Sequence, residues 1–592
     1  MEKWFIKNNP GDISRIVSEN KISKPLAKLL INRGLTEQNE IDAFLNPDIE
    51  KLHDPLLMHD MDAAGRLIMH KIETGKKILI VGDFDVDGIM STYVLFSVLS
   101  QVGADVDFTI PDRIQDGYGI NNHIVLKAKA ASVDTIITCD NGIAAFEAIK
   151  TGKKMGMTMI ITDHHDIPYI EKDGKQVSIL PEADCVLNPK KHSCQYPYKN
   201  LCGAGVAFKL ADHLIRISKL KVDIKNLLEM VAIATICDVV DLVGENRILV
   251  KEGLERLNNT SNLGLKALIN ESGLEDKAIT VYHVGFVIGP SLNASGRLDS
   301  ALLGLQLLLS KDEYEANEIA IKLRKLNDQR KSLTEIGTIE VGKMIEEKYI
   351  NDKVLVAYAP ETHESVAGII AGRIKEKYNR PTIVLTRAKE GVKGSGRSID
   401  AYNMFEELSR CRTLLGRFGG HPMAAGLSLK KENIDRLREC LNNNTNLEDE
   451  DLVKRVYIDM AMPLENISYE FIDDIGRLEP FGKGNPKPTF GLKGLNLSKA
   501  IILGTRRNVV KIDFDNPSPG KIEAIMFCDG DKWIEEVDYY YGLEERKRLT
   551  SGIANSVTMD IIFNPAINEY MGRASIQIVI NNYRFDRSRP RG

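Results

Sequence analysis

The chain has 592 residues, which is too long for one hydrophobic core, and a prior of roughly 100 to 200 residues per domain suggests three or four domains. Its formal net charge of -5 excludes a globally basic protein, so a nucleic-acid partner would have to meet a local groove. The eight cysteines lack CxxC spacing, which argues against a structural zinc site and for reduced thiols. Because no apolar run is long enough to cross a membrane, we expect a cytoplasmic protein without a membrane partner.

The first part of the chain combines a helical segment with an α/β pattern. Residues 1 to 75 are mostly helical in pattern and are expected to form an N-terminal helical cover. A core domain is expected from 76 to 310, where apolar strands alternate with helix-forming stretches, and this alternation predicts a doubly wound parallel sheet. The expected elements are strands at 77–81, 105–110, 133–138 and 157–162 and helices at 89–102 and 143–152.

The second part of the chain predicts a further lobe and a barrel. Residues 311 to 350 keep helical spacing with few interruptions, so we expect a connecting helix of roughly 50 Å. A second α/β lobe is expected from 351 to 450, with strand 353–358, helix 364–377, strand 382–386 and then a glycine-rich loop at 394–398. From 451 to 592, strand patterns separated by glycine, asparagine and proline turns predict a small β-barrel.

The segment Asp83-Phe84-Asp85-Val86-Asp87-Gly88 directly follows an apolar strand and carries three closely spaced carboxylates. Alternate side chains of extended backbone point to one side, and like charges this close tolerate each other poorly without a cation. The string also matches the start of an EF-hand loop, but position 12 is Val94 instead of a bidentate Glu. We therefore predict a divalent metal site that is not a calcium loop.

Two more clusters follow strands, at Asp140 and at Asp163-His164-His165. In an open α/β sheet such positions meet at the carboxyl edge, although Asp-rich turns are also common without a ligand. Asp238 ends a strongly apolar helix and could add a ligand from the side, with an ordinary helix-end carboxylate as the alternative. Oxygen ligands with an occasional imidazole suit Mn²⁺ or Mg²⁺, and two such cations sharing a carboxylate would suit displacement at a phosphoester.

These clusters resemble the four motifs of the DHH phosphoesterase superfamily, which is named for Asp163-His164-His165. Segments 292–298, 394–398, 419–426 and 480–486 resemble the RecJ family within it. By this resemblance two metal ions are bound by Asp83, Asp85, Asp140, His164 and Asp238, with Asp140 bridging them and acting in catalysis. His165 would be the second catalytic residue and contact the scissile phosphate. Asp87 would either ligate or orient the loop.

Gly394-Ser395-Gly396-Arg397 offers backbone amides, a hydroxyl and a guanidinium, which suits a phosphate, although a tight turn with an exposed Arg fits the spacing equally well. The resemblance implies that Ser395, Arg397 and Arg113 hold the 5′-terminal phosphate. It also places Asn293, Arg297 and His421 around the scissile phosphate. The resemblance further implies that the barrel at 451–592 is of the oligonucleotide-binding (OB-like) type. Candidate phosphate contacts in the barrel and the tail are Lys483, Lys499, Arg506, Arg507, Arg584, Arg587, Arg589 and Arg591.

The resemblance implies a 5′ to 3′ exonuclease that uses two Mn²⁺ or Mg²⁺ ions and acts on single-stranded DNA with a free 5′ end. It would release nucleoside 5′-monophosphates in repair and recombination, supplied by a helicase or a single-strand-binding protein. One alternative is a superfamily phosphodiesterase for short oligonucleotides or cyclic dinucleotides, against which the barrel argues. The other is a non-enzymatic single-strand-binding scaffold, which predicts eroded ligands. Ser291 stands where a basic residue is more common, and we expect it to weaken one DNA contact.

Overall fold

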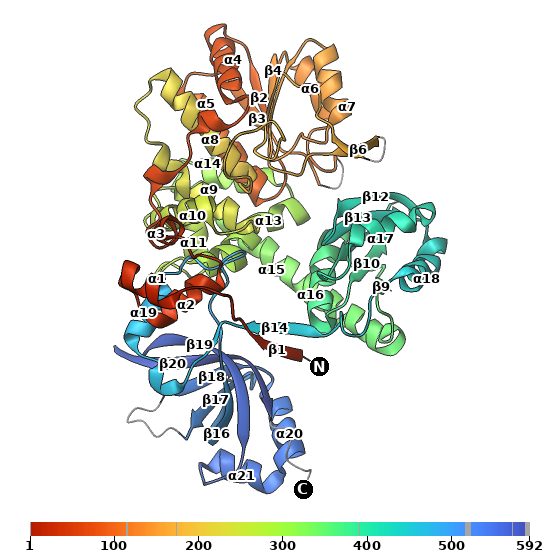
Figure 1. The fold of residues 1–592 in the computed structure, drawn as a ribbon. Coiled ribbons are helices and arrows are strands. Elements are labelled where there is room, and N and C mark those ends of the chain that lie inside the picture. The colour runs from red at the N-terminus through yellow and green to blue at the C-terminus, as the bar shows by residue number, and fades with distance from the viewer. Residues whose placement is uncertain are drawn as a thin grey trace. The chain divides into compact units, whose positions relative to one another are not determined.

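The computed structural model describes residues 2–113, 116–172, 175–389, 391–515, 522–570 and 572–585 (Figure 1). The tail residues Arg587, Arg589 and Arg591 lie outside these ranges. The chain forms two compact units, one made of residues 48–454 and the other of residues 1–47 together with 455–592. Among the described residues, no helix has both the length and the apolar character that crossing a membrane requires.

The larger unit begins with a five-stranded parallel sheet in the order β3-β2-β4-β5-β8, as the sequence predicts. After β2 the chain adds β3 on one side and β4 on the other, so the strand order switches direction at β2. Ligands of doubly wound sheets bind at the carboxyl ends of the strands beside such a switch. The strands are β2 Ile78–Val81, β3 Val106–Thr109, β4 Thr135–Cys139, β5 Thr158–Thr162 and β8 Cys185–Leu187, with a separate hairpin of β6 Tyr169–Lys172 and β7 Lys175–Ser178.

Helices cover both faces of this sheet because its strands are apolar on both sides. Ile80 and Ile137 belong to a core shared with α4, α5 and α8, whereas Val81 and Ile136 belong to one shared with α6 and α7 (Figure 1). The helices of this lobe are α4 Met61–Glu73, α5 Val86–Gln101, α6 Asn122–Ala130, α7 Phe146–Lys154, α8 Gly203–Ser218, α9 Leu228–Cys237, α10 Gly244–Leu257, α11 Leu263–Glu271, α12 Val281–His283, the π-helix η4 Val284–Ile288, α13 Gly289–Leu298 and α14 Leu302–Leu309.

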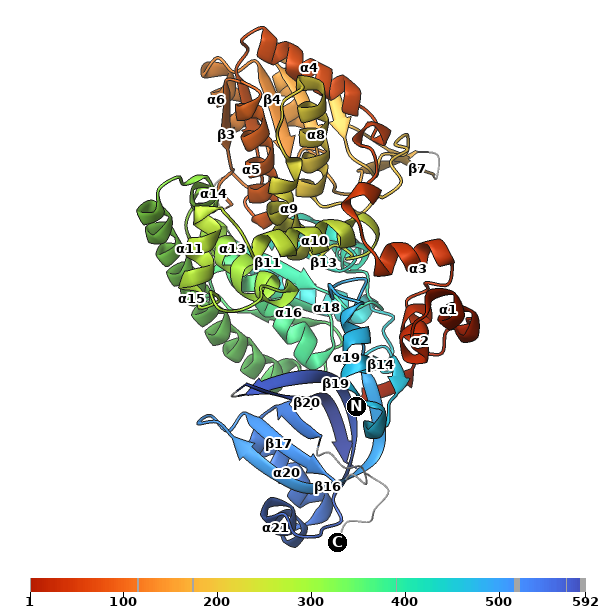
Figure 2. The same cartoon turned by 90° about the vertical axis from the view of Figure 1, so that its left-hand side faces the viewer.

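A long helix, α15 Glu313–Met344, leads from this lobe to the next and confirms the predicted connection. It continues as the π-helix η5 Ile345–Tyr349. Its first part packs against α11, α13 and α14, and its last part against α16 of the second lobe (Figure 2). Asp312 caps its start by accepting a hydrogen bond from the Glu315 backbone N–H.

The second lobe is a five-stranded mixed sheet in the order β12-β13-β11-β10-β9. The glycine-rich run expected to be a loop is instead part of strand β11, which pairs with β10 on one side and β13 on the other. A Cβ at 394 would lie 2.4 Å from Leu385 Cδ2, so a larger residue there would require the Leu385 side chain to shift. The elements are β9 Leu355–Tyr358, η6 Glu364–Val366, α16 Ala367–Tyr378, β10 Thr382–Arg387, β11 Val392–Arg397, α17 Met404–Arg410, β12 Leu415–His421, β13 Ala424–Leu429 and α18 Ile434–Asn444.

One cysteine pair departs from the expectation of reduced thiols. Cys411, at the end of α17, and Cys440, in α18, form a disulfide. They are separated by 29 residues. The sequence does not reveal the pair because only the packing of α17 beside α18 brings the two sulfurs together. Six other cysteines are free thiols.

The smaller unit contains the predicted barrel, in which β16, β17, β18, β20 and β19 follow one another and β16 closes the ring on β19. The expected helical cover at 1–75 is divided: residues 1–47 belong to this unit, and the rest belongs to the larger one. The reason is that Leu26 and Leu30 pack in one apolar cluster with the barrel domain. The elements are β1 Glu2–Ile6, α1 Ile13–Asn20, α2 Lys24–Asn32, α3 Gln38–Leu45, β14 Lys454–Ile458, β15 Met460–Ala461, α19 Tyr469–Gly476, β16 Phe490–Leu503, β17 Val509–Phe514, β18 Glu523–Phe527, α20 Gly530–Tyr541, α21 Leu543–Ser551, β19 Thr558–Tyr570 and β20 Arg573–Phe585.

Candidate active site

The carboxyl ends of β2, β4 and β5 bring the predicted metal ligands to one crevice. Asp83 and Asp85 follow β2, and Asp140 follows the neighbouring strand β4. One carboxylate oxygen from each of these three residues lies within 4.8 Å of the other two. The predicted convergence at the strand ends is therefore what the structure has.

A second ligand group adjoins the first. Asp87, His164 and Asp238 each place a ligand atom within 4.8 Å of the others. His164 Nε2 lies 3.1 Å from Asp140 Oδ1, so Asp140 stands between the two groups. The last residue of α9 precedes Asp238, and that helix carries the carboxylate to the crevice from the side.

The donor set of this crevice fits a divalent cation. Among the residues that the structure describes, four buried ligand atoms lack a hydrogen-bond partner, and such atoms are costly unless something else satisfies them. They are Asp83 Oδ1, Asp140 Oδ1, His164 Nε2 and Asp238 Oδ2. All four can donate an electron pair to Mn²⁺ or Mg²⁺.

The electrostatics of the crevice favour the binding of a cation. Burial, followed by repulsion from neighbouring carboxylates, raises the pKa of Asp83 and of Asp140 well above the usual range. The same causes raise the pKa of Asp238 to about 8. Burial and the nearby His165 charge lower the pKa of His164 to about 3, so its ring is neutral and able to ligate.

Asp87 is held by backbone rather than left open. Its Oδ2 accepts a hydrogen bond from the Gly203 backbone N–H at 2.6 Å, and its Oδ1 accepts one from Ala204 at 2.7 Å. These two amides open helix α8, where the helix dipole favours a negative charge. A Cβ on Gly203 would lie only 2.6 Å from Asp140 Cβ, so this helix end also lies directly against Asp140.

The turn after β4 has an unusual backbone. Asp140 has φ 61°, a left-handed conformation that non-glycine residues seldom adopt. Its N–H donates to Thr162 O at 3.0 Å. Asn141, which the sequence analysis missed, donates from Nδ2 to Val81 O at 3.0 Å and to Cys139 O at 2.8 Å. These bonds tie the turn to β2 and fix the direction of the Asp140 carboxylate.

His165 is positioned as a charged hydrogen-bond donor. Its Nδ1 lies 2.8 Å from Asp163 Oδ1, and Asp163 also accepts from the backbone N–H groups of His164 and His165. Burial opposes the charged ring, but the bond to Asp163 raises the pKa of His165 to about 9. The Tyr118 hydroxyl, also missed from sequence, donates to Asp140 O at 2.9 Å and lies 3.2 Å from His165 Nδ1. Asp163 thus braces the histidine pair.

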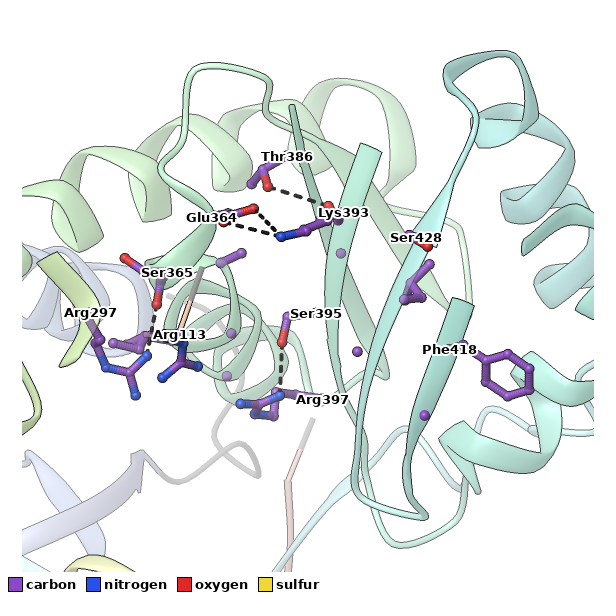
Figure 3. A pocket seen from close by; sticks show the side chains of 18 of the residues that line it. Arg113, Arg297, Glu364, Ser365, Thr386, Lys393, Ser395, Arg397, Phe418 and Ser428 are labelled. Carbon is purple, nitrogen blue, oxygen red and sulfur yellow. Dashed lines mark hydrogen bonds and ion pairs between the residues drawn. The ribbon is translucent and has the colours of Figure 1, made fainter. Parts of the chain in front are cut away.

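A cavity of about 990 Å³ lies beside the crevice, between α16 and the face of the second sheet (Figure 3). The first lobe contributes Arg113 and Arg297, and strand β11 contributes Ser395 and Arg397. Because side chains alternate along a strand, Ser395 and Arg397 share one face, and Arg397 Nη1 donates to Ser395 Oγ at 3.2 Å. Arg297 Nη1 donates to Ser365 O at 2.8 Å, which links the two lobes.

The cavity has the charge that an anion requires. Burial, and then the positive charge of Arg113, lowers the pKa of Arg297 to about 9 and that of Arg397 below its usual value. The start of α16 also lines the cavity and adds the positive end of its dipole. Guanidinium groups crowded in this way suit a phosphate. Arg373 and Arg417, which the sequence analysis did not single out, line the same cavity.

Three further residues named in the sequence analysis, Asn293, His421 and Ser291, differ in their surroundings. Asn293 Oδ1 accepts from the Val86 backbone N–H at 3.2 Å, which places Asn293 at the carboxylate loop. His421 is the last residue of β12. The hydrogen bond from Lys190 is the main cause that lowers the pKa of Asp166, the residue after His165, and the charge of His421 contributes to the same shift. Ser291 is buried and bonds to Asn327 at 3.1 Å. That this serine weakens one DNA contact stays a prediction.

Two of the basic residues proposed for phosphate contact in the barrel domain already form ion pairs. Arg507 pairs with Asp531 at 2.7 Å, so part of its charge is already balanced. Arg584 pairs with Asp560 at 2.8 Å and lies over the Trp4 ring, 4.5 Å from its centroid. Either arginine could still contact a phosphate, but part of its charge is already neutralised by a carboxylate.

Comparison with known proteins identifies three domains along the chain. Family models match at 77–235 (DHH family, N-terminal domain), 351–446 (DHHA1 domain) and 458–582 (RecJ OB domain). The single-stranded-DNA-specific exonuclease RecJ of Bacillus subtilis (strain 168) is 36% identical over 585 residues, covering 98% of this chain and 70% of the relative.

Two solved structures share the fold. The crystal structure of RecJ from Thermus thermophilus in complex with Mn²⁺ matches all of this chain and 80% of that one, with a TM-score of 0.81 and 25% identity. The crystal structure of the protein from the same organism in complex with Mg²⁺ matches with a TM-score of 0.76 at 24% identity, again over all of this chain and 79% of that one. From these matches and the DHH crevice, we conclude that this chain belongs to the RecJ family of the DHH superfamily.

Proposed function

We propose that this protein is a metal-dependent exonuclease specific for single-stranded DNA that degrades the strand from its 5′ end. The observation that carries the proposal is a crevice of unsatisfied buried ligand atoms beside an arginine-lined cavity. The family relative is named for single-stranded-DNA-specific exonuclease activity, which supports the choice of substrate. Buried ligand atoms without a hydrogen-bond partner have no evident use in a protein that only binds a strand.

The ions would be Mn²⁺ or Mg²⁺, and the ligand arrangement supports two of them. Asp83, Asp85 and Asp140 form one ligand group, and His164 and Asp238 complete a second group on the other side of Asp140. When bound, such ions stabilise charge at phosphorus and activate water. Asp87 would orient the site rather than ligate, because both of its oxygens already accept backbone hydrogen bonds.

The protein groups around the crevice then act on the phosphodiester. The charged ring of His165 would donate a hydrogen bond to a non-bridging oxygen, and Asp163 keeps that ring protonated near neutral pH. Water forms a new bond to phosphorus while the bond from phosphorus to the 3′-oxygen of the terminal nucleotide breaks. The terminal nucleotide leaves as a nucleoside 5′-monophosphate with a 3′-hydroxyl, and the shortened strand keeps a new 5′-phosphate.

End recognition would lie in the arginine-lined cavity. A terminal 5′-phosphate carries more negative charge than an internal diester, so Arg113, Arg397 and Ser395 would favour it over any internal position. Arg297 and Asn293 lie between this cavity and the carboxylates and would hold the scissile phosphate. This order of sites supports 5′ to 3′ polarity.

The cellular role follows from the substrate. A 5′ to 3′ single-strand exonuclease fits DNA repair and recombination, and we propose that it acts in the cytoplasm. It needs single strands, so a helicase that unwinds duplex or a single-strand-binding protein is the partner we propose.

The test is digestion of one oligonucleotide with a 5′-phosphate or with a blocked 5′ end, in Mn²⁺, in Mg²⁺ and in chelator. We expect metal-dependent release of mononucleotides from the free 5′ end. Release from the 3′ end, endonucleolytic fragments, or intact DNA in every condition would overturn the proposal.

A further inference from the structure

Two stacked aromatic rings stand on the surface of the first lobe. Tyr282 is 63% exposed and Phe286 is 67% exposed. Their ring centroids are 5.0 Å apart, with an angle of 28° between the ring planes. A single exposed aromatic residue is ordinary, but two exposed rings stacked on each other present apolar ring surface to solvent.

The helix that carries this pair packs directly against the metal crevice. Tyr282 lies in α12 and Phe286 in η4, and the helix continues as α13. A Cβ on Gly289 would lie 2.3 Å from Cys237 Sγ, so glycine permits this close approach. Cys237 is the residue before the ligand Asp238, and the aromatic pair is therefore anchored beside the crevice.

The same helix orders three features along its length. After the aromatic pair comes Asn293, bonded to the carboxylate loop, and then Arg297, which lines the phosphate cavity. At about 1.5 Å per residue, Phe286 precedes Asn293 by about 10 Å and Arg297 by about 16 Å along the axis. A strand with its 5′ end in the cavity and its scissile phosphate at the carboxylates would next reach the aromatic pair.

The residue after Asp238 adds a further exposed apolar side chain. Val239 is 59% exposed and has φ 56°, which is a strained conformation for a β-branched residue. This backbone conformation exposes an apolar group immediately after a metal ligand. The strain is consistent with a functional surface rather than a packing need.

We propose that Tyr282 and Phe286 form a base-stacking platform for single-stranded DNA on the 3′ side of the scissile phosphate. The inference rests on the proposed function, since it places the substrate strand in the crevice. Every base has a flat face, so stacking holds a strand without selecting its sequence. Bases of a duplex already stack on each other, and the platform would therefore favour unpaired strands.

The test compares ring removal with a matched surface control. Variants Tyr282→Ala and Phe286→Ala should each raise KM for a 5′-phosphorylated single strand about 5- to 100-fold and leave kcat within about twofold. Phe286→Leu should behave like Phe286→Ala because it keeps apolar bulk without a ring, and Phe286→Trp should restore KM. Tyr314→Ala, at an exposed aromatic on α15 (75% exposed), should leave KM unchanged.

A fluorescent base locates the contact directly. With 2-aminopurine placed at successive positions from the 5′ end, we expect quenching in the native protein at a position downstream of the cut, and its loss in Phe286→Leu. Unchanged KM and unchanged quenching in both the Ala and the Leu variants would overturn the platform while digestion continued. Failure of the native protein to digest any strand would instead overturn the proposed function.

Discussion

Adding one methyl group at Gly203 should disable the metal crevice without touching a ligand. Gly203 is the first residue of α8, and its N–H donates to Asp87. A Cβ at this position would lie 2.6 Å from Asp140 Cβ and 2.7 Å from Asp140 Oδ1. Carbon atoms in contact prefer about 3.5–4.0 Å, so Gly203→Ala must displace the Asp140 carboxylate or the start of α8 by about 1 Å.

The displacement has two separable costs. Overpacking of this kind destabilises a protein by about 1–3 kcal/mol, partly offset by the better helix propensity of Ala. A shift of about 1 Å in a catalytic group can lower the rate about 100-fold. Because Asp140 stands between both ligand groups, we also expect weaker binding of Mn²⁺.

The assay is a Mn²⁺ titration by calorimetry, combined with kcat on a 5′-phosphorylated single strand and a thermal melt in chelator. Gly205→Ala is the control, since its Cβ would meet the Leu201 side chain at 3.2 Å and no metal ligand. We expect the control to keep metal affinity and rate close to those of the native protein. Native metal affinity and kcat in Gly203→Ala would refute the reasoning, because Asp140 would then tolerate the added carbon.

Three further outcomes are expected. In metal-free protein, burial raises the pKa of Asp238 to about 8, and the bond to Asp163 raises the pKa of His165 to about 9 although burial opposes this shift. Between about pH 6.5 and 8 the folded state therefore binds more protons than the unfolded chain. The free energy of unfolding, measured with urea in chelator, should therefore fall with rising pH by at most about 1.4 kcal/mol per unit for each proton, less for the partly exposed His165, and a rise would contradict the assignment. Arg397→Ala should lower the preference for a 5′-phosphate over a 5′-hydroxyl about 10- to 100-fold in kcat/KM, with an unchanged ratio as the contrary result. Asp163→Asn should move the alkaline limb of the pH–rate profile to lower pH, because His165 loses the bond that raises its pKa, and an unmoved limb would show that another group titrates there.

The meeting of the candidate ligands at one edge of the sheet could be predicted because their signal is local. Each ligand cluster follows an apolar run, and the topology of a parallel sheet brings such strand ends together without any knowledge of side-chain packing. Asp83 and Asp140 follow neighbouring strands, and the prediction that they meet needed only the alternation of strands and helices. The fold class follows from the same periodicity.

Other parts of the site depend on contacts that have no pattern in the sequence. The amides of Gly203 and Ala204 hold Asp87 from 116 residues or more away, and backbone amides look alike in every sequence. Tyr118 and Asn141 act through single hydrogen bonds to Asp140 O and Val81 O. Asn141 belongs to the motif that begins at Asp140, but neither its position nor that of Tyr118 reveals the backbone group that it bonds.

The glycine-rich run at 394–398 shows how composition can mislead. Glycine favours turns, so the sequence predicts a loop here, yet the run is part of strand β11, where a Cβ at 394 would lie 2.4 Å from Leu385 Cδ2. The strand gives Ser395 and Arg397 a fixed face, which a loop would not. Packing therefore overrides the rule that glycine weakens strands.

The spacing of Asn293 and Arg297 on α13 bears on the length of each product. The two residues are one helical turn apart, about 6 Å along the axis, with the carboxylate loop at one and the phosphate cavity at the other. Since both residues would hold the scissile phosphate, this rigid turn of helix would keep that phosphate at a constant distance from the 5′-phosphate in the cavity. The length of each product would then be set by a rigid element of the fold, and every round of cutting would leave the next 5′-phosphate one step short of the same cavity.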